Sequence, residues 1–253
     1  NSPWLKSKMV IKGGVLLALG YGTARHTKDL DFSTPRRIQE EDTSAILDEL
    51  DKALATERAK DPALLCRVQS HKLEPPGPDA SFPTLRIRVG YAFQGERQFQ
   101  RMVQGRNSAQ VVIIDLSFNE QTCVTSAIAI DGQQIAAYSL YDQVAEKYRA
   151  MIQQTSDRRG RVRRQDLYDL YSILRADHLA DAEDKAILLN TMKTKFSARD
   201  VSCEREVINE PEIAQRSGRE YARLQDEVDG DLPDFDHAFR IVRDFYLSLP
   251  WSR

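Results

Sequence analysis

Two aspartates separated by a single residue are the clearest chemical feature of this 253-residue sequence. Asp29 and Asp31 fall in a stretch expected to form a short strand, so the alternation of side chains places both carboxylates on one face. Adjacent like charges raise one another's pKa unless a cation lies between them. Carboxylate oxygens are the ligands that Mg²⁺ prefers, with substrate phosphates completing its coordination. The pair therefore predicts a metal site.

A glycine pair precedes these aspartates. Gly13 and Gly14 run directly into an apolar segment, residues 15–19, that is expected to be helical. Glycines at a helix start leave backbone N–H groups unobstructed, and the positive end of the helix dipole favours phosphate. Glycines, helix and Asp-x-Asp in this order predict a site for a nucleoside triphosphate and a metal ion.

A third carboxylate, Asp115, interrupts an apolar stretch at 111–118 that is expected to be a strand. An aspartate in such a strand is costly unless it is paired or bound to a metal. Asp115 is either a strand-end residue that faces solvent or a third metal ligand. With three carboxylates, two Mg²⁺ ions about 3.5–4 Å apart can stabilise the attacking and leaving oxygens of an in-line displacement.

A lysine is placed on the inward face of a helix expected at 140–154. Lys147 lies three residues after Val144 and four before Met151, which share the apolar face. It either extends its charged end to water or contacts phosphate. No fixed anion partner is assumed for it, so its removal is expected to impair triphosphate use more than folding.

The elements that position these residues change in character along the chain. Strands are expected near 64–73, 84–93 and 111–118, with a hairpin at 126–138 that turns at Asp131-Gly132. A helix is expected at 39–60, and further helices near 140–154, 164–177, 183–193, 211–227 and 236–248. The sequence therefore predicts two parts: residues 1–139, which contain the strands, and residues 140–253, which contain helices alone.

The bulk composition excludes some classes of protein. Charged residues make up 29% of the chain and the net charge is only −2, so any nucleic-acid contact requires a local basic patch. The three cysteines have neither metal-ligand spacing nor a disulfide pattern, which is typical of a reducing cytoplasm. The sequence shows neither a signal peptide nor an apolar run of membrane-spanning length. It begins without Met, which leaves open whether its N-terminus is native or trimmed.

The motifs together resemble the AbiEii/AbiGii family of abortive-infection and toxin–antitoxin nucleotidyltransferases, within the polymerase-β-like superfamily. The first motif matches at Lys12-Gly13-Gly14, Leu16, Gly22, Arg25, Thr27 and Asp29-Leu30-Asp31-Phe32. The others match at Asp115, at Glu146-Lys147 with Ala150-Met151, and from Arg163 to Tyr171. Gln165 stands where the family has a basic residue, so the last match is incomplete.

The resemblance implies an α+β fold: a mixed sheet flanked by helices (1–139) followed by a helical domain (140–253) that closes over the nucleotide. It implies that Mg²⁺, with Mn²⁺ as an alternative, is held by Asp29, Asp31 and Asp115. The residues expected to bind the nucleotide are Gly13, Gly14, Arg25, Thr27 and Lys147. Asp166, favoured over Asp169 by the helical wheel, is expected to act as a base or as the partner of Lys147.

The expected activity is transfer of NMP from an NTP to an RNA acceptor, with a tRNA 3′ end as the leading candidate and pyrophosphate as the product. The resemblance also implies a cytoplasmic toxin with a cognate antitoxin protein. An arginine-dense loop just before Asp166 could be a solvated turn or could contact polyphosphate or RNA; its candidates are Arg158, Arg161, Arg163 and Arg164.

Three alternatives stay open from the sequence. The same chemistry could act on a protein side chain or a small-molecule hydroxyl. A metal-dependent glycosyltransferase fits poorly, because only 28 residues precede Asp29, too few for a preceding βαβ nucleotide-binding half. A non-catalytic binding module is disfavoured because all three carboxylates are intact.

Overall fold

The computed structural model describes residues 2–38, 40–77, 80–155 and 163–251. Its contacts divide the chain into two compact units. Unit 1 comprises Asn1–Val15, Lys28–Glu120 and Ala127–Ala137, and unit 2 comprises Leu16–Thr27, Gln121–Ser126 and Tyr138–Arg253. The units differ from a division at residue 139 because 16–27 and 121–126 group with the helices. The division into domains 1–139 and 140–253 stays a proposal.

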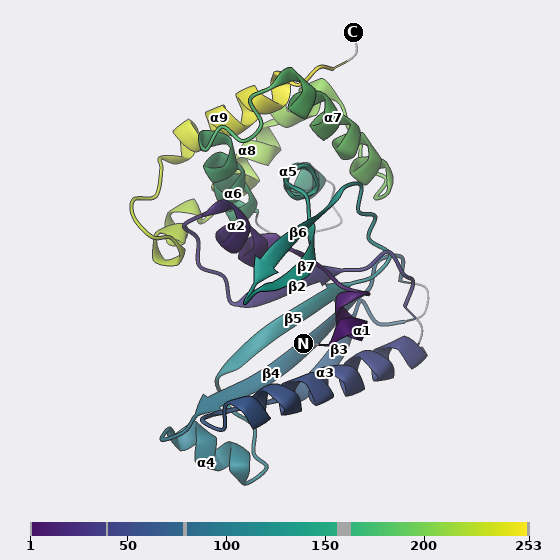
Figure 1. The fold of residues 1–253 in the computed structure, drawn as a ribbon. Coiled ribbons are helices and arrows are strands. Elements are labelled where there is room, and N and C mark those ends of the chain that lie inside the picture. The colour runs from purple at the N-terminus through teal and green to yellow at the C-terminus, as the bar shows by residue number, and fades with distance from the viewer. Residues whose placement is uncertain (1, 39, 78–79, 156–162, 252–253) are drawn as a thin grey trace. The chain divides into compact units, whose positions relative to one another are not determined.

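A seven-stranded mixed sheet is formed by the described residues, in the order β3-β4-β5-β2-β1-β7-β6 (Figure 1). The strands are β1 (Val10–Lys12), β2 (Asp29–Ser33), β3 (Leu64–Glu74), β4 (Thr84–Phe93), β5 (Val111–Ser117), β6 (Thr125–Ile130) and β7 (Gln133–Tyr138). β2 runs parallel to β5 and antiparallel to β1, whereas β4 is antiparallel to both β3 and β5. The mixed sheet confirms the α+β prediction.

One face of this sheet carries the core of unit 1. Leu85, Ile87 and Val89 alternate along β4 and pack with Leu116 of β5 and Ile46 of α3 (Glu40–Lys60). Helix α3 runs along β3 in Figure 1. Because side chains alternate in a strand, Arg86 and Arg88 of β4 and Asp115 of β5 lie on the opposite face.

The turn of the hairpin lies where the sequence predicted it. Asp131 and Gly132 have φ values of 47° and 73°, as a two-residue hairpin turn requires, so the predicted hairpin is confirmed. Unit 1 also contains α1 (Pro3–Lys6), α4 (Arg97–Val103) and the start of α2 (Gly13–Tyr21).

The core of unit 2 is helical. It is built from α5 (Leu140–Ile152), α6 (Arg164–Arg175), α7 (Ala182–Ser197), α8 (Pro211–Gly218) and α9 (Phe235–Leu247), with 3₁₀ turns at Gln153–Thr155, Arg205–Asn209 and Tyr221–Glu227. The predicted single helix at 211–227 is wrong, because Glu220 adopts φ 57° and separates α8 from the last 3₁₀ turn.

Residues 121–126 are held in unit 2 by a buried carboxylate of α5. Asp142 accepts hydrogen bonds from the backbone N–H groups of Cys123 and Val124 at 3.0 and 2.8 Å. Lys195 of α7 lies 3.0 Å from the same carboxylate. These contacts explain why a segment between two strands of the sheet belongs to the helical unit.

Candidate active site

The predicted carboxylates of unit 1 come together through the register of two parallel strands. Asp31 of β2 is directly paired with Asp115 of β5, and Asp29 is paired with Ile113. Paired residues on neighbouring strands face the same side of the sheet, and Asp29 shares that side because it lies two residues before Asp31. We call Asp29, Asp31 and Asp115 the carboxylate cluster.

The electrostatics show that these carboxylates interact. Partial burial, followed by repulsion from Asp115, raises the pKa of Asp29 above its ordinary value, and Arg86 opposes the shift. Asp115 is 9% exposed, so its charge is largely removed from water. A surplus of negative charge in a partly dry place favours binding of a cation.

An arginine that the sequence did not single out contacts the cluster. Arg86 of β4 is the register partner of Asp115. Its Nε donates to Oδ1 of Asp115 at 2.8 Å, and its Nη2 donates to Oδ2 at 2.6 Å. In the sequence, alternation with Leu85 and Ile87 indicates only that Arg86 is on the polar face of a strand. Its partner could not be read from the sequence, because the pairing depends on the register of two distant segments.

Charges of both signs line up across four strands on this face. Lys12 of β1 pairs in register with Asp31, Asp31 with Asp115, and Asp115 with Arg86. Lys12 is buried and lies 4.0 Å from Glu120. The two central carboxylates are thus flanked by a cation on each side.

Gly13 approaches the cluster from the start of α2. It has φ +71°, and an ideal Cβ there would lie 2.8 Å from Cγ of Asp31. Such a distance excludes any side chain unless Asp31 moves, and the positive φ adds strain for every residue except glycine. The predicted glycine pair therefore does open a helix, and Gly13 leaves room for the Asp31 carboxylate.

The donor chemistry of the cluster fits a hard divalent cation, since three carboxylates share one face. Within the described ranges, no group of three or more Asp, Glu, His or Cys side chains is arranged as a metal site. The bidentate pair with Arg86 engages both oxygens of Asp115 in place of such an arrangement. The assignment of Asp29, Asp31 and Asp115 as metal ligands stays a proposal.

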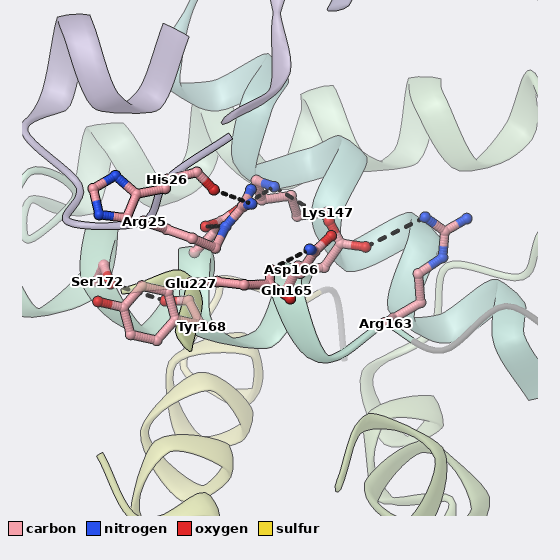
Figure 2. A network of polar contacts seen from close by, with 10 residues as sticks. Arg25, His26, Lys147, Arg163, Gln165, Asp166, Tyr168, Ser172 and Glu227 are labelled. Atoms are coloured by element: carbon pink, nitrogen blue, oxygen red, sulfur yellow. Dashed lines mark hydrogen bonds and ion pairs between the residues drawn. The ribbon is translucent and has the colours of Figure 1, made fainter. Parts of the chain in front are cut away.

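The remaining predicted polar residues meet in unit 2. Arg25 donates through Nε and Nη2 to the two oxygens of Asp169 at 2.8 and 2.9 Å. Lys147 of α5 donates to Asp169 at 2.6 Å and to Asp166 at 3.2 Å. We call Arg25, Lys147, Asp166 and Asp169 the ion-pair network; Figure 2 shows Lys147 close to Asp166 and to Arg25.

Burial and charge shape this network together. Burial by itself would raise the pKa of Asp169, but Lys147 and Arg25 outweigh it and hold that pKa below its ordinary value. Burial would likewise lower the pKa of Lys147, yet Asp169 and Asp166 raise it. Asp169 and Lys147 are thus both stabilised in their charged forms.

Two expectations about this region are wrong. Lys147 is inward-facing as predicted, but it has two fixed anion partners. Asp169, which the helical wheel placed away from the apolar arc, has a side chain only 1% exposed and lies closer to Lys147 than Asp166 does. The wheel failed because Tyr168 and Ile173 are buried too, so α6 is enclosed on more sides than its leucines indicate.

The segment that carries Arg25 is attached to residues 227–229. Arg25 forms a β-bridge with Val228, and the N–H of His26 donates to the carbonyl of Glu227 at 2.7 Å. His26 Nε2 lies 2.9 Å from Asp229, an exposed contact. Arg25 therefore has a fixed backbone as well as a fixed partner. Thr27 belongs to the same segment of unit 2, whereas Gly13 and Gly14 belong to unit 1.

The arginine-dense loop is described only in part. Arg158 and Arg161 lie outside the described residues. Arg163 is 3.5 Å from Asp166, visible in Figure 2. Arg164 contacts Glu220 at 3.1 Å and Glu227 at 3.3 Å. The role of these four arginines in RNA binding stays a proposal.

Comparison with known proteins gives a family. The family model described as "Nucleotidyl transferase AbiEii toxin, Type IV TA system" matches residues 4–241. Among curated proteins, none matches this sequence. None of the helices in the described part of the chain is long and apolar enough to cross a membrane.

Two solved structures share the fold. A protein from H. pylori described as a candidate nucleotidyltransferase is 16% identical, with a TM-score of 0.51 over 96% of this chain and 86% of its own. JHP933 from Helicobacter pylori is 15% identical, with a TM-score of 0.52 over 96% of this chain and 84% of its own. At such identities the similarity concerns the fold alone.

Proposed function

Since the chain belongs to the AbiEii nucleotidyltransferase toxin family of type IV toxin–antitoxin systems, we propose that it transfers NMP from an NTP to an RNA 3′ hydroxyl. The bond between acceptor oxygen and α-phosphorus forms, the bond to the β-phosphate bridging oxygen breaks, and pyrophosphate leaves. The hydroxyl proton passes to a base. A cognate antitoxin protein is the implied partner of such a toxin.

The observation that supports this proposal best is the register that pairs Asp31 with Asp115. We propose that Asp29, Asp31 and Asp115 hold Mg²⁺, with Mn²⁺ as an alternative. The bound ion would stabilise negative charge on the transferring phosphoryl group and on the leaving pyrophosphate. Gly13 keeps side-chain atoms away from Asp31, so the carboxylate can remain close to the start of α2.

Lys147 and Arg25 are the proposed triphosphate contacts, together with backbone N–H groups at Gly13-Gly14 and with Thr27. Asp169 fixes the direction of both cations, because it accepts from Arg25 and Lys147 at once. Asp166, at 3.2 Å from Lys147, is the more exposed of the two aspartates and is the proposed base.

The direct test incubates the protein with total RNA and each labelled NTP in turn, with Mg²⁺ or Mn²⁺. Labelled RNA from the parent and none from Asp31→Asn would support the proposal. Asp48→Asn, an exposed acid on α3, is the matched control and should retain activity. Label on protein or on a small molecule would change the acceptor, and equal labelling by Asp31→Asn would overturn the proposal.

We further propose that the acceptor is a tRNA 3′ end and that its backbone contacts the arginine-dense loop. About three such contacts give a slope of roughly −2 to −3 when the logarithm of the RNA binding constant is plotted against the logarithm of the salt concentration. Replacing Arg161, Arg163 and Arg164 with Gln should flatten that slope and raise the RNA KM, with the triphosphate KM nearly unchanged. A triple Gln variant at the exposed arginines Arg205, Arg219 and Arg223 controls for net charge. A variant that loses triphosphate affinity and keeps its slope would show that the loop serves phosphate instead.

A further inference from the structure

Arg86 is bound to the carboxylate cluster in a specific geometry. Two of its nitrogens point at the two oxygens of Asp115, at 2.8 and 2.6 Å, which is the bidentate arrangement typical of strong guanidinium–carboxylate pairs. Its Nη1 lies 3.6 Å from Glu74 of β3 on the other side. The guanidinium is therefore held between a partly exposed acid and the most enclosed carboxylate of the cluster.

The neighbouring arginine on the same strand behaves differently. Arg88 lies two residues further along β4, so it occupies the same face of the sheet. It is exposed, and its side chain has neither a hydrogen-bond nor an ion-pair partner among the described residues, although its backbone pairs with β3 and β5. The pairing of Arg86 is thus a property of its register opposite Asp115 and not of basic residues on this face in general.

A charge balance explains what Arg86 does for the cluster. Hydrogen bonding to Asp115 is the largest cause that raises the pKa of Arg86, which keeps the guanidinium charged. The same charge opposes the rise in the pKa of Asp29. Without Arg86, the 9% exposed carboxylate of Asp115 would lose the cation that contacts both of its oxygens, at a cost to the metal-free fold.

We propose that Arg86 is the resident counter-ion of the carboxylate cluster, which neutralises Asp115 in the metal-free protein and competes with the divalent cation for it. The inference rests on the metal site in the proposed function. A cation at Asp115 would share oxygens that already accept from Arg86, so the two positive charges would repel and each would weaken the other's hold on the carboxylate. Arg86 thereby protects the metal-free fold and lowers the affinity for metal.

The experiment measures thermal unfolding of the full chain in EDTA and across a Mg²⁺ titration, with Mn²⁺ as a second series. Arg86→Gln should lower Tm in EDTA and reduce the Mg²⁺ concentration at half-maximal stabilisation about tenfold, because one positive charge near the ion is removed. Arg88→Gln, the matched control, should change neither quantity. Arg86→Lys keeps the charge without the bidentate geometry and should reduce the midpoint, meaning the Mg²⁺ concentration at half-maximal stabilisation, by less.

The outcomes separate this inference from the proposal on which it rests. A parent protein that Mg²⁺ and Mn²⁺ do not stabilise would overturn the metal site and the counter-ion together. A parent that responds, with an unchanged or higher midpoint in Arg86→Gln, would overturn the counter-ion alone and make Arg86 a positioning residue for Asp115. If Arg86→Gln does not fold, the Arg86→Lys midpoint decides: an unchanged or higher value would contradict competition.

Discussion

The carboxylate cluster of unit 1 and the ion-pair network of unit 2 use the same kinds of side chain in opposite balance. The cluster has three aspartates, of which Asp115 binds Arg86 and Asp31 is the register partner of Lys12. The network has two aspartates and two cations, and each of its members has a partner within it. Asp29 and Asp31 of the cluster are partly exposed, and Asp115 is 9% exposed, whereas Arg25, Lys147 and Asp169 of the network are all buried.

This difference predicts different effects of mutation on stability, although Arg25 and Lys147 are also the proposed triphosphate contacts. In a balanced, buried network every charge has an oppositely charged partner. Removal of one partner leaves an uncompensated charge, which is strongly destabilising. In the cluster the pKa of Asp29 is raised, which means that its charged form is disfavoured in the fold, so removal of this carboxylate should relieve repulsion and harm only binding. Removal of Asp29 and removal of Asp169 should therefore have opposite effects on stability.

The largest loss of stability is expected from Asp169→Asn. Arg25 and Lys147 would both lose their main anion inside the helical core, so the free energy of unfolding should fall by about 3–5 kcal/mol. Urea unfolding followed by circular dichroism measures this. Asp166→Asn is the comparison, with a loss of about 1 kcal/mol or less, because Asp166 is more exposed. Equal losses would contradict the central role of Asp169.

The same residue gives a pH dependence with a definite sign. The pKa of Asp169 is lowered in the folded state, so the stability that it contributes is complete above the unfolded pKa of about 3.9. It is lost as pH falls through the folded-state pKa. Stability measured from pH 6 to pH 2 should therefore drop less steeply in Asp169→Asn than in the parent.

Lys147→Ala should cost about 3 kcal/mol, near the low end for a broken buried pair, because Arg25 still compensates Asp169. This reverses the expectation from sequence that the fold would tolerate its loss. Triphosphate use should also fall, measured as single-turnover transfer at saturating NTP in the fraction that remains folded. Retention of full stability would show that the Lys147 pairs contribute nothing to the fold.

Arg164→Gln should cost no more than about 1 kcal/mol. Its contacts with Glu220 and Glu227 are at the surface of unit 2, where ion pairs contribute little. Thermal unfolding at low and high salt measures it, and the difference from the parent should shrink at high salt. A loss comparable to that of Lys147→Ala would extend the structural network to this arginine.

The smallest effect on stability is expected at the carboxylate cluster. Asp29→Asn should leave Tm in EDTA unchanged or raise it, since the pKa of Asp29 is raised and its charged form is disfavoured in the fold. Because its folded-state pKa is raised, Asp29 itself should contribute more stability as pH falls, so any advantage of Asp29→Asn over the parent should shrink on acidification. Transfer activity should be lost. Lower stability in EDTA with activity retained would contradict the assignment.

The sequence predicted the elements and most of the local geometry. Alternation along 84–93 and the apolar run at 111–118 predicted β4 and β5, and the spacing of Asp29 and Asp31 predicted that they share a face. These features depend on a few neighbouring residues, so local periodicity carries them. The family was recognisable for the same reason, because its motifs are short and ordered.

The sequence named Asp166 as a possible partner of Lys147, and the two are 3.2 Å apart. The other partners could not be predicted, because they are set by register and by packing between distant segments. Arg86 meets Asp115 only through the pairing of β4 with β5. Arg25 and Asp169 are 144 residues apart. The burial of Asp169 was not predicted, because a helical wheel shows one apolar arc whereas α6 is buried on several sides. A charged residue on such a side needs cations from other segments of the chain.

The separation of Arg25 from Asp169 has a consequence for how the protein is made. At about 5–20 residues per second, a ribosome takes roughly 7–30 seconds to synthesise the 144 residues between them. Through that interval the segment 16–27, with its apolar Leu16 and Leu17, has been synthesised but lacks the helices against which it packs. The core of the helical unit can therefore form only late in translation. A nascent chain stalled before α6 contains the carboxylate cluster but lacks the ion-pair network.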